Sequence, residues 1–176
     1  MKTKVIIGII SFTVLTLNLF AQCKFKKNES DPFTSEKHLV TKNITLNGDM
    51  KSANESKFFA VTNIELTGTK IRWNFEYYDR SLRNNKSTKS IKLRLKTNDG
   101  VIEISTDDIP DPKYTVTDNS EMTEFDFHFD LTIDQLKSIS KGLSLVGMEI
   151  FNDNKIFKVG NLPDVVEYAK CMIENK

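Results

Sequence analysis

Strict alternation of apolar and polar residues between positions 124 and 131 is the feature that most constrains the fold. Every second residue of this segment is apolar, namely Phe125, Phe127, Phe129 and Leu131. Residues i, i+2 and i+4 of a β-strand point to the same face, so this period predicts a strand with one buried side. The segment therefore predicts a sheet that covers a hydrophobic core.

A short helix is predicted directly after this strand, over about residues 133–140. Thr132 is a favourable N-cap residue, and Gln135 stands three positions later, as in a capping box. Gly142 is placed to end the helix, because glycine readily adopts the backbone conformation that stops one. A second helix is predicted over about 162–174, with Asn161 as its cap.

The same two-residue period recurs along most of the remaining chain. It predicts further strands at about 38–46, 58–66, 70–78, 90–97, 101–105, 114–117, 143–151 and 155–159. Alternation of this kind is typical of antiparallel sheets with one face on the core and the other in water. The sequence thus predicts a mainly β protein, an antiparallel β-sandwich or partly closed barrel of about eight to nine short strands with the two helices added.

The first 22 residues read as a signal peptide, since Lys2 and Lys4 precede an apolar run over 5–20. That run is shorter than the roughly 20 residues of a membrane-spanning helix. Residues 23–35 are predicted to be a flexible tether and 36–176 a single β-rich domain with a C-terminal helix. The protein is expected to be exported, to the periplasm or as an outer-membrane or cell-surface lipoprotein.

The two cysteines allow two mutually exclusive interpretations. The residues before Cys23, Leu-Phe-Ala-Gln, resemble a bacterial lipobox, in which the cysteine is acylated and anchors the protein. Cleavage after Ala21 is the alternative, and it would leave Cys23 free to form a disulfide with Cys171. On a helical wheel Cys171 lies opposite the apolar stripe of its helix, which predicts an accessible sulfur.

Two groups of acidic residues are candidate metal or hydrolytic sites. The first is the polar face of the predicted strand over 124–131, which carries Glu124, Asp126, His128 and Asp130. The second surrounds two prolines and consists of Asp107, Asp108 and Asp111. Alternate residues on one strand lie roughly 7 Å apart, so the row needs donors from a second strand to hold an ion. A solvated face and turn-forming aspartates are the simpler interpretations. No hydrolase or phosphate-binding motif is present, and no cofactor is expected.

Aromatic residues in the segment 70–78 form a candidate surface for a ligand or partner. The residues concerned are Arg72, Trp73, Tyr77 and Tyr78. Tyrosine, tryptophan and arginine are enriched in binding hot spots. Trp73 and Tyr77 share the inward phase of the strand, which favours a place in the core, whereas Tyr78 points the other way.

These features predict an exported bacterial cell-envelope protein that binds and does not catalyse. Its partner would be another envelope protein or a small apolar or sugar ligand, with membrane contact only through an N-terminal lipid. The near balance of 25 Lys+Arg against 24 Asp+Glu gives no reason to expect nucleic acid binding. Alternatives are a metal-dependent or hydrolytic envelope enzyme using surface carboxylates, and a secreted eukaryotic glycoprotein carrying glycans at Asn28, Asn43, Asn54 or Asn85.

Overall fold

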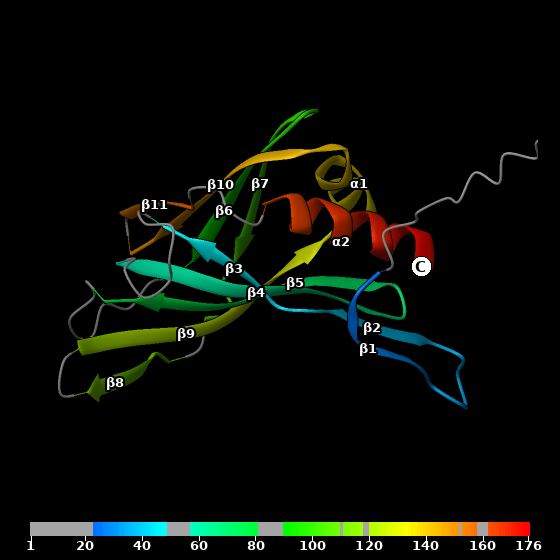
Figure 1. Ribbon diagram of the computed structural model, residues 1–176, viewed down its shortest axis with the longest axis horizontal. Helices are drawn as coiled ribbons and strands as arrows, with labels where there is room; N and C mark the ends of the chain where they lie inside the picture. The colour runs from blue at the N-terminus through cyan, green and yellow to red at the C-terminus, as the bar shows by residue number, and fades with distance from the viewer. Residues whose placement is uncertain are drawn as a thin grey trace, which may run out of the picture.

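The structure, a computed structural model, is a two-layered arrangement of antiparallel strands and two helices (Figure 1). It describes residues 23–48, 57–80, 90–109, 111–117, 120–151, 153–157 and 162–176. The predicted signal peptide, Asn54, Asn85 and Asn161 lie outside these residues. Neither sheet closes on itself, so the predicted mainly β sandwich is confirmed and the barrel alternative is not.

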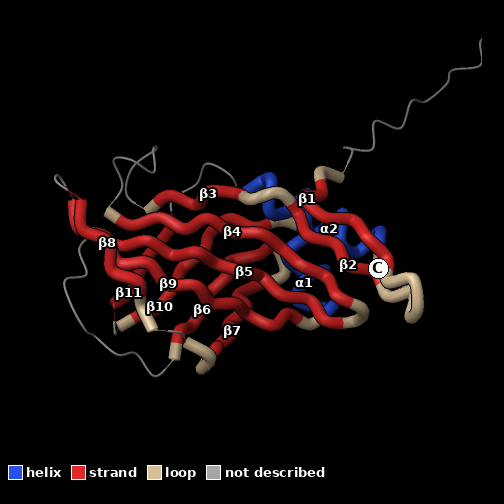
Figure 2. Tube along the Cα trace, turned by 90° about the horizontal axis from the view of Figure 1, so that it is seen from below, coloured by secondary structure: helices blue, strands red, loops and turns tan. Residues whose placement is uncertain are grey.

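The larger layer is a seven-stranded sheet with the order β1-β2-β4-β5-β9-β8, in which β3 also pairs with β4. Its long central strands come from two hairpins that meet where β5 pairs with β9. Figure 2 shows these strands side by side, with the helices behind them. The strands are β1 (Phe25–Ser30), β2 (Lys37–Thr41), β3 (Ile44–Asn47), β4 (Phe58–Thr67), β5 (Lys70–Asp79), β8 (Lys113–Thr117) and β9 (Ser120–Leu131).

The smaller layer is a four-stranded sheet with the order β11-β10-β6-β7. The chain leaves the large sheet after β5, forms the β6–β7 hairpin, returns for β8 and β9, and then crosses back to place β10 beside β6. The two sheets are therefore interlaced along the sequence. The strands are β6 (Ile91–Thr97), β7 (Gly100–Thr106), β10 (Leu143–Ile150) and β11 (Asp153–Phe157).

The two helices, α1 (Ile133–Lys141) and α2 (Leu162–Asn175), lie on the same side of the large sheet as the small sheet does (Figure 1). They pack on each other, and α2 also contacts β3, β4 and β10. The predicted capping box is present, because the Thr132 side chain accepts from the Gln135 N–H and the Gln135 side chain accepts from the Thr132 N–H. Both helix predictions are confirmed.

Aromatic rings of β5 and β9 fill the space between the layers. Trp73 and Phe129 are 0% exposed, and Phe75 stacks on Phe127 with 5.7 Å between ring centroids. Phe129 meets Phe75 edge-on at 5.5 Å. These contacts come from the alternation that the sequence shows, since neighbouring antiparallel strands place their apolar residues on one common face.

The predicted tether is wrong where β1 forms. Residues 25–30 pair with β2, with Glu29 opposite His38 and Asn28 opposite Leu39. β1 is an edge strand, so its polar and charged side chains can stay in water while its backbone completes a ladder. Composition alone had suggested disorder, because a lysine- and asparagine-rich edge strand has the same residues as a linker.

The predicted strand over 38–46 is divided into β2 and β3, and both parts pair with β4. Lys42 and Asn43 separate the two parts. At this break the fully buried Thr41 accepts a hydrogen bond from the backbone N–H of Ile64 through Oγ1, at 2.9 Å. A side chain thus satisfies a β4 backbone donor beside the break in the ladder.

Replacing Thr41 with valine should lower the free energy of unfolding by about 1–3 kcal/mol, the usual cost of a buried donor without an acceptor. Thr41→Ser keeps the hydroxyl and should lose clearly less. Urea unfolding followed by tryptophan fluorescence measures both. Equal losses in the two variants would show that packing of the methyl group, and not the hydrogen bond, accounts for the effect.

Candidate functional site

The face of the large sheet that points away from the small sheet, here called the outer face, carries aligned rows of polar side chains from β4, β5 and β9. The register puts one row at Glu65, Arg72 and Asp130 and the next at Asn63, Asn74 and His128. Two further rows follow: Val61, Glu76 and Asp126, and then Phe59, Tyr78 and Glu124. The face therefore brings together residues from distant parts of the chain.

A hollow of about 280 Å³ lies in the middle of the outer face and is called the central hollow here. Its polar lining consists of Asn63, Asn74, Glu76, Asp126 and His128. Its apolar lining is Val61, Phe75 and Phe127. All these residues stand on β4, β5 and β9, which are paired along most of their length and hold the side chains at fixed spacing.

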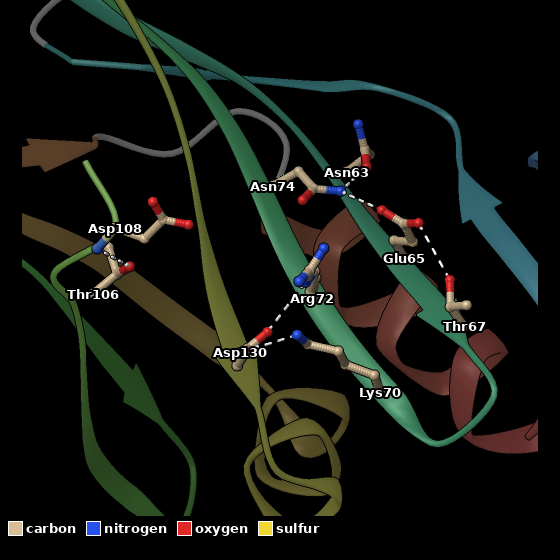
Figure 3. Close-up of polar contacts among 9 residues, drawn as sticks. All are labelled: Asn63, Glu65, Thr67, Lys70, Arg72, Asn74, Thr106, Asp108 and Asp130. Atoms are coloured by element: carbon tan, nitrogen blue, oxygen red, sulfur yellow. Dashed lines mark hydrogen bonds and ion pairs between the residues drawn. The ribbon is translucent and has the colours of Figure 1, made fainter. Parts of the chain in front are cut away.

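A hydrogen-bond network fixes one wall of the central hollow (Figure 3). Asn74 Nδ2 donates to Asn63 Oδ1 at 3.0 Å and to Glu65 Oε2 at 3.1 Å. Glu65 Oε1 accepts from His38 Nε2 at 3.0 Å and from Thr67 Oγ1 at 3.3 Å. Both side-chain amide hydrogens of Asn74 are used in this way. Its side-chain carbonyl oxygen has no hydrogen bond from another described residue.

The same network lowers the pKa of the Glu65 carboxyl below its ordinary value of 4.5. Partial burial raises this pKa, but the hydrogen bonds from Asn74 and His38 and the charge of His38 outweigh it. A lowered pKa in the folded state contributes stability above the unfolded pKa, and this contribution is lost as pH falls through the folded pKa.

Replacing Asn74 with alanine should therefore raise the Glu65 pKa. The part of the unfolding free energy that is lost on acidification should then be smaller than in wild type. The reason is that the largest of the interactions favouring the carboxylate is removed. NMR titration of the Glu65 side-chain carboxyl carbon measures the shift directly. An unchanged or lower pKa in the variant would contradict the assigned cause.

The predicted acidic row does not converge on a common point, because its carboxylates pair with different cations along β9. Asp130 lies 3.3 Å from Arg72 Nε and 3.7 Å from Lys70 Nζ (Figure 3). Lys113 Nζ lies 2.7 Å from Asp126 and 3.5 Å from Glu124. Within the described ranges, no three His, Cys, Asp or Glu side chains are grouped so that they could hold a metal ion.

The second acidic group is also spread out. Asp107, Asp108 and Asp111 are exposed, and the Asp108 backbone N–H donates to Thr106 Oγ1 at 3.3 Å (Figure 3). This is turn geometry of the kind expected from the composition. None of the three lines the central hollow.

Two groups of the hollow retain hydrogen-bonding capacity. His128 makes no hydrogen bond or ion pair with any other described residue, although its imidazole can both donate and accept. Asp126 Oδ1 is covered and has no donor among the described residues, while the other side of this carboxylate binds Lys113. A covered acceptor without a donor is unfavourable, and this oxygen lies out of contact with solvent.

The aromatic candidates divide between the two faces. Trp73 and Tyr77 are fully buried on the inner face, in the core position that their inward phase favours, so they are not part of an exposed surface. The Tyr77 hydroxyl donates to Asp79 Oδ2 at 2.7 Å. Tyr78 stands on the outer face and stacks on Phe59 with 4.7 Å between centroids. Burial, with the charges of Glu124 and Glu76, raises the pKa of Tyr78 to about 12.

Cys23 and Cys171 form a disulfide that joins residues 148 positions apart. Cys171 is only 6% exposed, which corrects the prediction of an accessible sulfur. At the C-terminal end of α2, Cys23 bonds to Cys171 and Lys37 Nζ of β2 donates to the Asn175 carbonyl at 2.7 Å. A helical wheel could not show these contacts, because they come from the other end of the chain.

Sequence reasoning missed the residues of β4 that line the hollow, Val61 and Asn63, and their neighbour Glu65. A signal for them existed. The Thr67-Gly68-Thr69 turn, with Gly68 at φ 57°, joins β4 and β5 closely enough to fix their register. With that register, the pairing of Asn63 with Asn74 follows, but the pairing of β5 with β9 does not.

The hollow combines amide, carboxylate and imidazole groups with the apolar side chain of Val61, while the rings of Phe75 and Phe127 beneath it are buried in the core. This set suits recognition by hydrogen bonds with a small nonpolar contact. Among the described residues, neither helix has the length and hydrophobicity required to cross a bilayer. Comparison with known proteins found no matching family model, no matching curated protein and no matching solved structure.

Proposed function

We propose that this protein is an exported bacterial cell-envelope protein that binds a ligand or partner through the central hollow and does not catalyse a reaction. The observation that carries the proposal is the hollow itself. It holds the His128 imidazole and the Asn74 side-chain carbonyl oxygen, neither of which has a hydrogen bond to another described residue. Pre-positioned polar groups over apolar contacts are the usual composition of a binding site.

Rigidity of the hollow supports binding. Asn74 is held by two hydrogen bonds, and the lining residues sit on strands in the middle of a sheet. A site built on fixed strands loses little conformational entropy when a ligand arrives. The ion pairs of Lys113 and Arg72 border the hollow and keep the neighbouring side chains in place.

Export is supported by residues 1–22 and by the disulfide. Disulfides persist in oxidising compartments outside the cytosol. The Cys23 sulfur that bonds to Cys171 is the atom that a lipid would need, so we propose the soluble exported form over the lipoprotein. Asn28 and Asn43 are exposed. Their N-x-S/T sequences are also expected by chance in a chain rich in lysine and asparagine, so they are not evidence for glycosylation.

Mass spectrometry of the mature protein tests the export proposal. The expected mass is that of a chain cleaved after Ala21, two hydrogens lighter than the fully reduced form and without acyl groups. A diacyl or triacyl mass on Cys23 would contradict the soluble form, and a chain retaining residues 1–22 in the cytosol would contradict export.

Retention of envelope components tests the binding proposal. Immobilised protein is incubated with a solubilised envelope fraction of its own source, and the double variant Asn74→Ala, His128→Ala is compared with wild type. Arg94→Ala, on the outer side of the small sheet where Arg94 pairs with Glu103 at 2.9 Å, is the matched control. A component retained by wild type and control but not by the double variant is expected. Equal retention by all three would contradict a role for the hollow.

A further inference from the structure

We infer that the ligand of the central hollow is a carbohydrate, with one sugar ring of a glycan chain seated across β4, β5 and β9. This inference rests on the proposed binding function and adds the chemical class of the ligand. Four properties of the hollow carry it: its hydrogen-bonding groups, its charge, the apolar side chain of Val61 and its size.

The groups left to a ligand are mixed. Asn74 offers its side-chain carbonyl oxygen, and His128 offers one donor and one acceptor in its neutral form. A hydroxyl group is both donor and acceptor, so adjacent hydroxyls of a sugar ring match such a set. A ligand with acceptors alone would leave the Asn74 oxygen unsatisfied, at the cost of an unpaired polar group.

The charges around the hollow disfavour ionic ligands. Two cations of the outer face, Arg72 and Lys113, are already paired with Asp130 and with Asp126. An anionic ligand would have to displace these carboxylates and would then face Glu76. A metal ion is also disfavoured, because the described residues bring no three suitable ligands together.

Carbohydrate recognition also uses contacts between apolar side chains and the C–H groups of a sugar ring. Val61 stands on the outer face beside Glu76, where it can contact the C–H groups of a sugar ring. Phe59 and Tyr78 form a rim one row away. Their rings are stacked on each other, so one face of each ring is already covered by the other.

The size of the hollow favours a single ring. Its volume of about 280 Å³ lies just below the range of roughly 300–1,000 Å³ that is typical of sites for drug-sized ligands. The hollow lies on the surface of a sheet, so the rest of a glycan chain could continue along the outer face. We therefore expect one tightly contacted sugar with weaker contacts to its neighbours.

Titration of the ¹⁵N-labelled, disulfide-bonded protein with soluble oligosaccharides tests the inference. The probes are cello-, xylo-, manno- and chito-oligosaccharides of about four to six units, each added to about 10 mM. At least one is expected to shift amide signals of β4, β5 and β9 around Asn63, Asn74 and His128. Asn74→Ala and His128→Ala should each weaken that binding about threefold to tenfold, the effect of one hydrogen bond, and Arg94→Ala should leave it unchanged.

The outcomes separate this inference from the binding proposal. If none of the four probes shifts these signals, the carbohydrate inference is overturned, while the envelope-retention experiment still decides whether the hollow binds something else. If a probe binds but the shifts lie elsewhere, or if both single variants bind as wild type does, the inference is equally overturned. The spectrum of each unliganded variant shows whether it is folded, and the two variants test the inference independently.

Discussion

Replacing Asp79 with alanine should lower the free energy of unfolding by about 3–5 kcal/mol, the usual effect of breaking a buried ion pair. Asp79 ends β5 and is 0% exposed. Its Oδ2 atom lies 3.1 Å from Lys155 Nζ on β11 and accepts from the Tyr77 hydroxyl at 2.7 Å. The substitution would thus remove a link between the two sheets and leave the buried Tyr77 hydroxyl without this acceptor.

Asp153→Ala is the matched control, because Asp153 pairs with the same Lys155 at 2.8 Å but is 61% exposed. An exposed ion pair contributes about 0–1 kcal/mol, so this variant should be close to wild type. Urea unfolding at neutral pH measures both. A loss at Asp79 as small as that at Asp153 would show that the buried pair does not hold the sheets together.

Removing the disulfide is the second change with a large expected effect. The double variant Cys23→Ser, Cys171→Ser should lose about 2–5 kcal/mol. The loop it opens spans 148 positions, and in the chain-entropy description longer loops give the larger values. The backbone amides of β1 and of the end of α2 should lose protection from hydrogen exchange first. Both segments lie next to the disulfide, and β1 is an edge strand of the large sheet.

Denaturant unfolding of the oxidised protein, the reduced protein and the double variant measures this effect, and hydrogen exchange locates it. The reduced protein and the double variant should agree with each other. Equal stability of oxidised and reduced protein would mean that non-covalent packing alone fixes the N-terminal segment on α2.

Local patterns in the sequence predicted most elements of the fold. The alternation in β5 and β9 identified the inner rings, and Thr132 with Gln135 identified the start of α1. These signals depend on residues within a few positions of one another. The predictions held because backbone period and capping are decided locally.

Features that depend on distant residues were not predictable in this way. β1 became a strand because β2 offers it an edge, and Cys171 became buried because the N-terminal segment covers it. The central hollow needs the register of β5 against β9, where Asn74 meets His128. No local signal encodes that pairing. The sequence therefore identified His128 as a candidate but not Asn63 of β4, which lies in the same row across the sheet.

The interlaced order of the two sheets also affects how the chain can assemble. Phe75 of β5 pairs with Phe127 of β9, and Leu95 of β6 pairs with Val146 of β10, so each earlier strand needs a partner from much later in the chain. Folds governed by such long-range pairings form slowly, commonly in milliseconds to seconds. A growing chain can therefore complete the large sheet only after β9, which ends at Leu131, and the small sheet only after β11, which ends at Phe157.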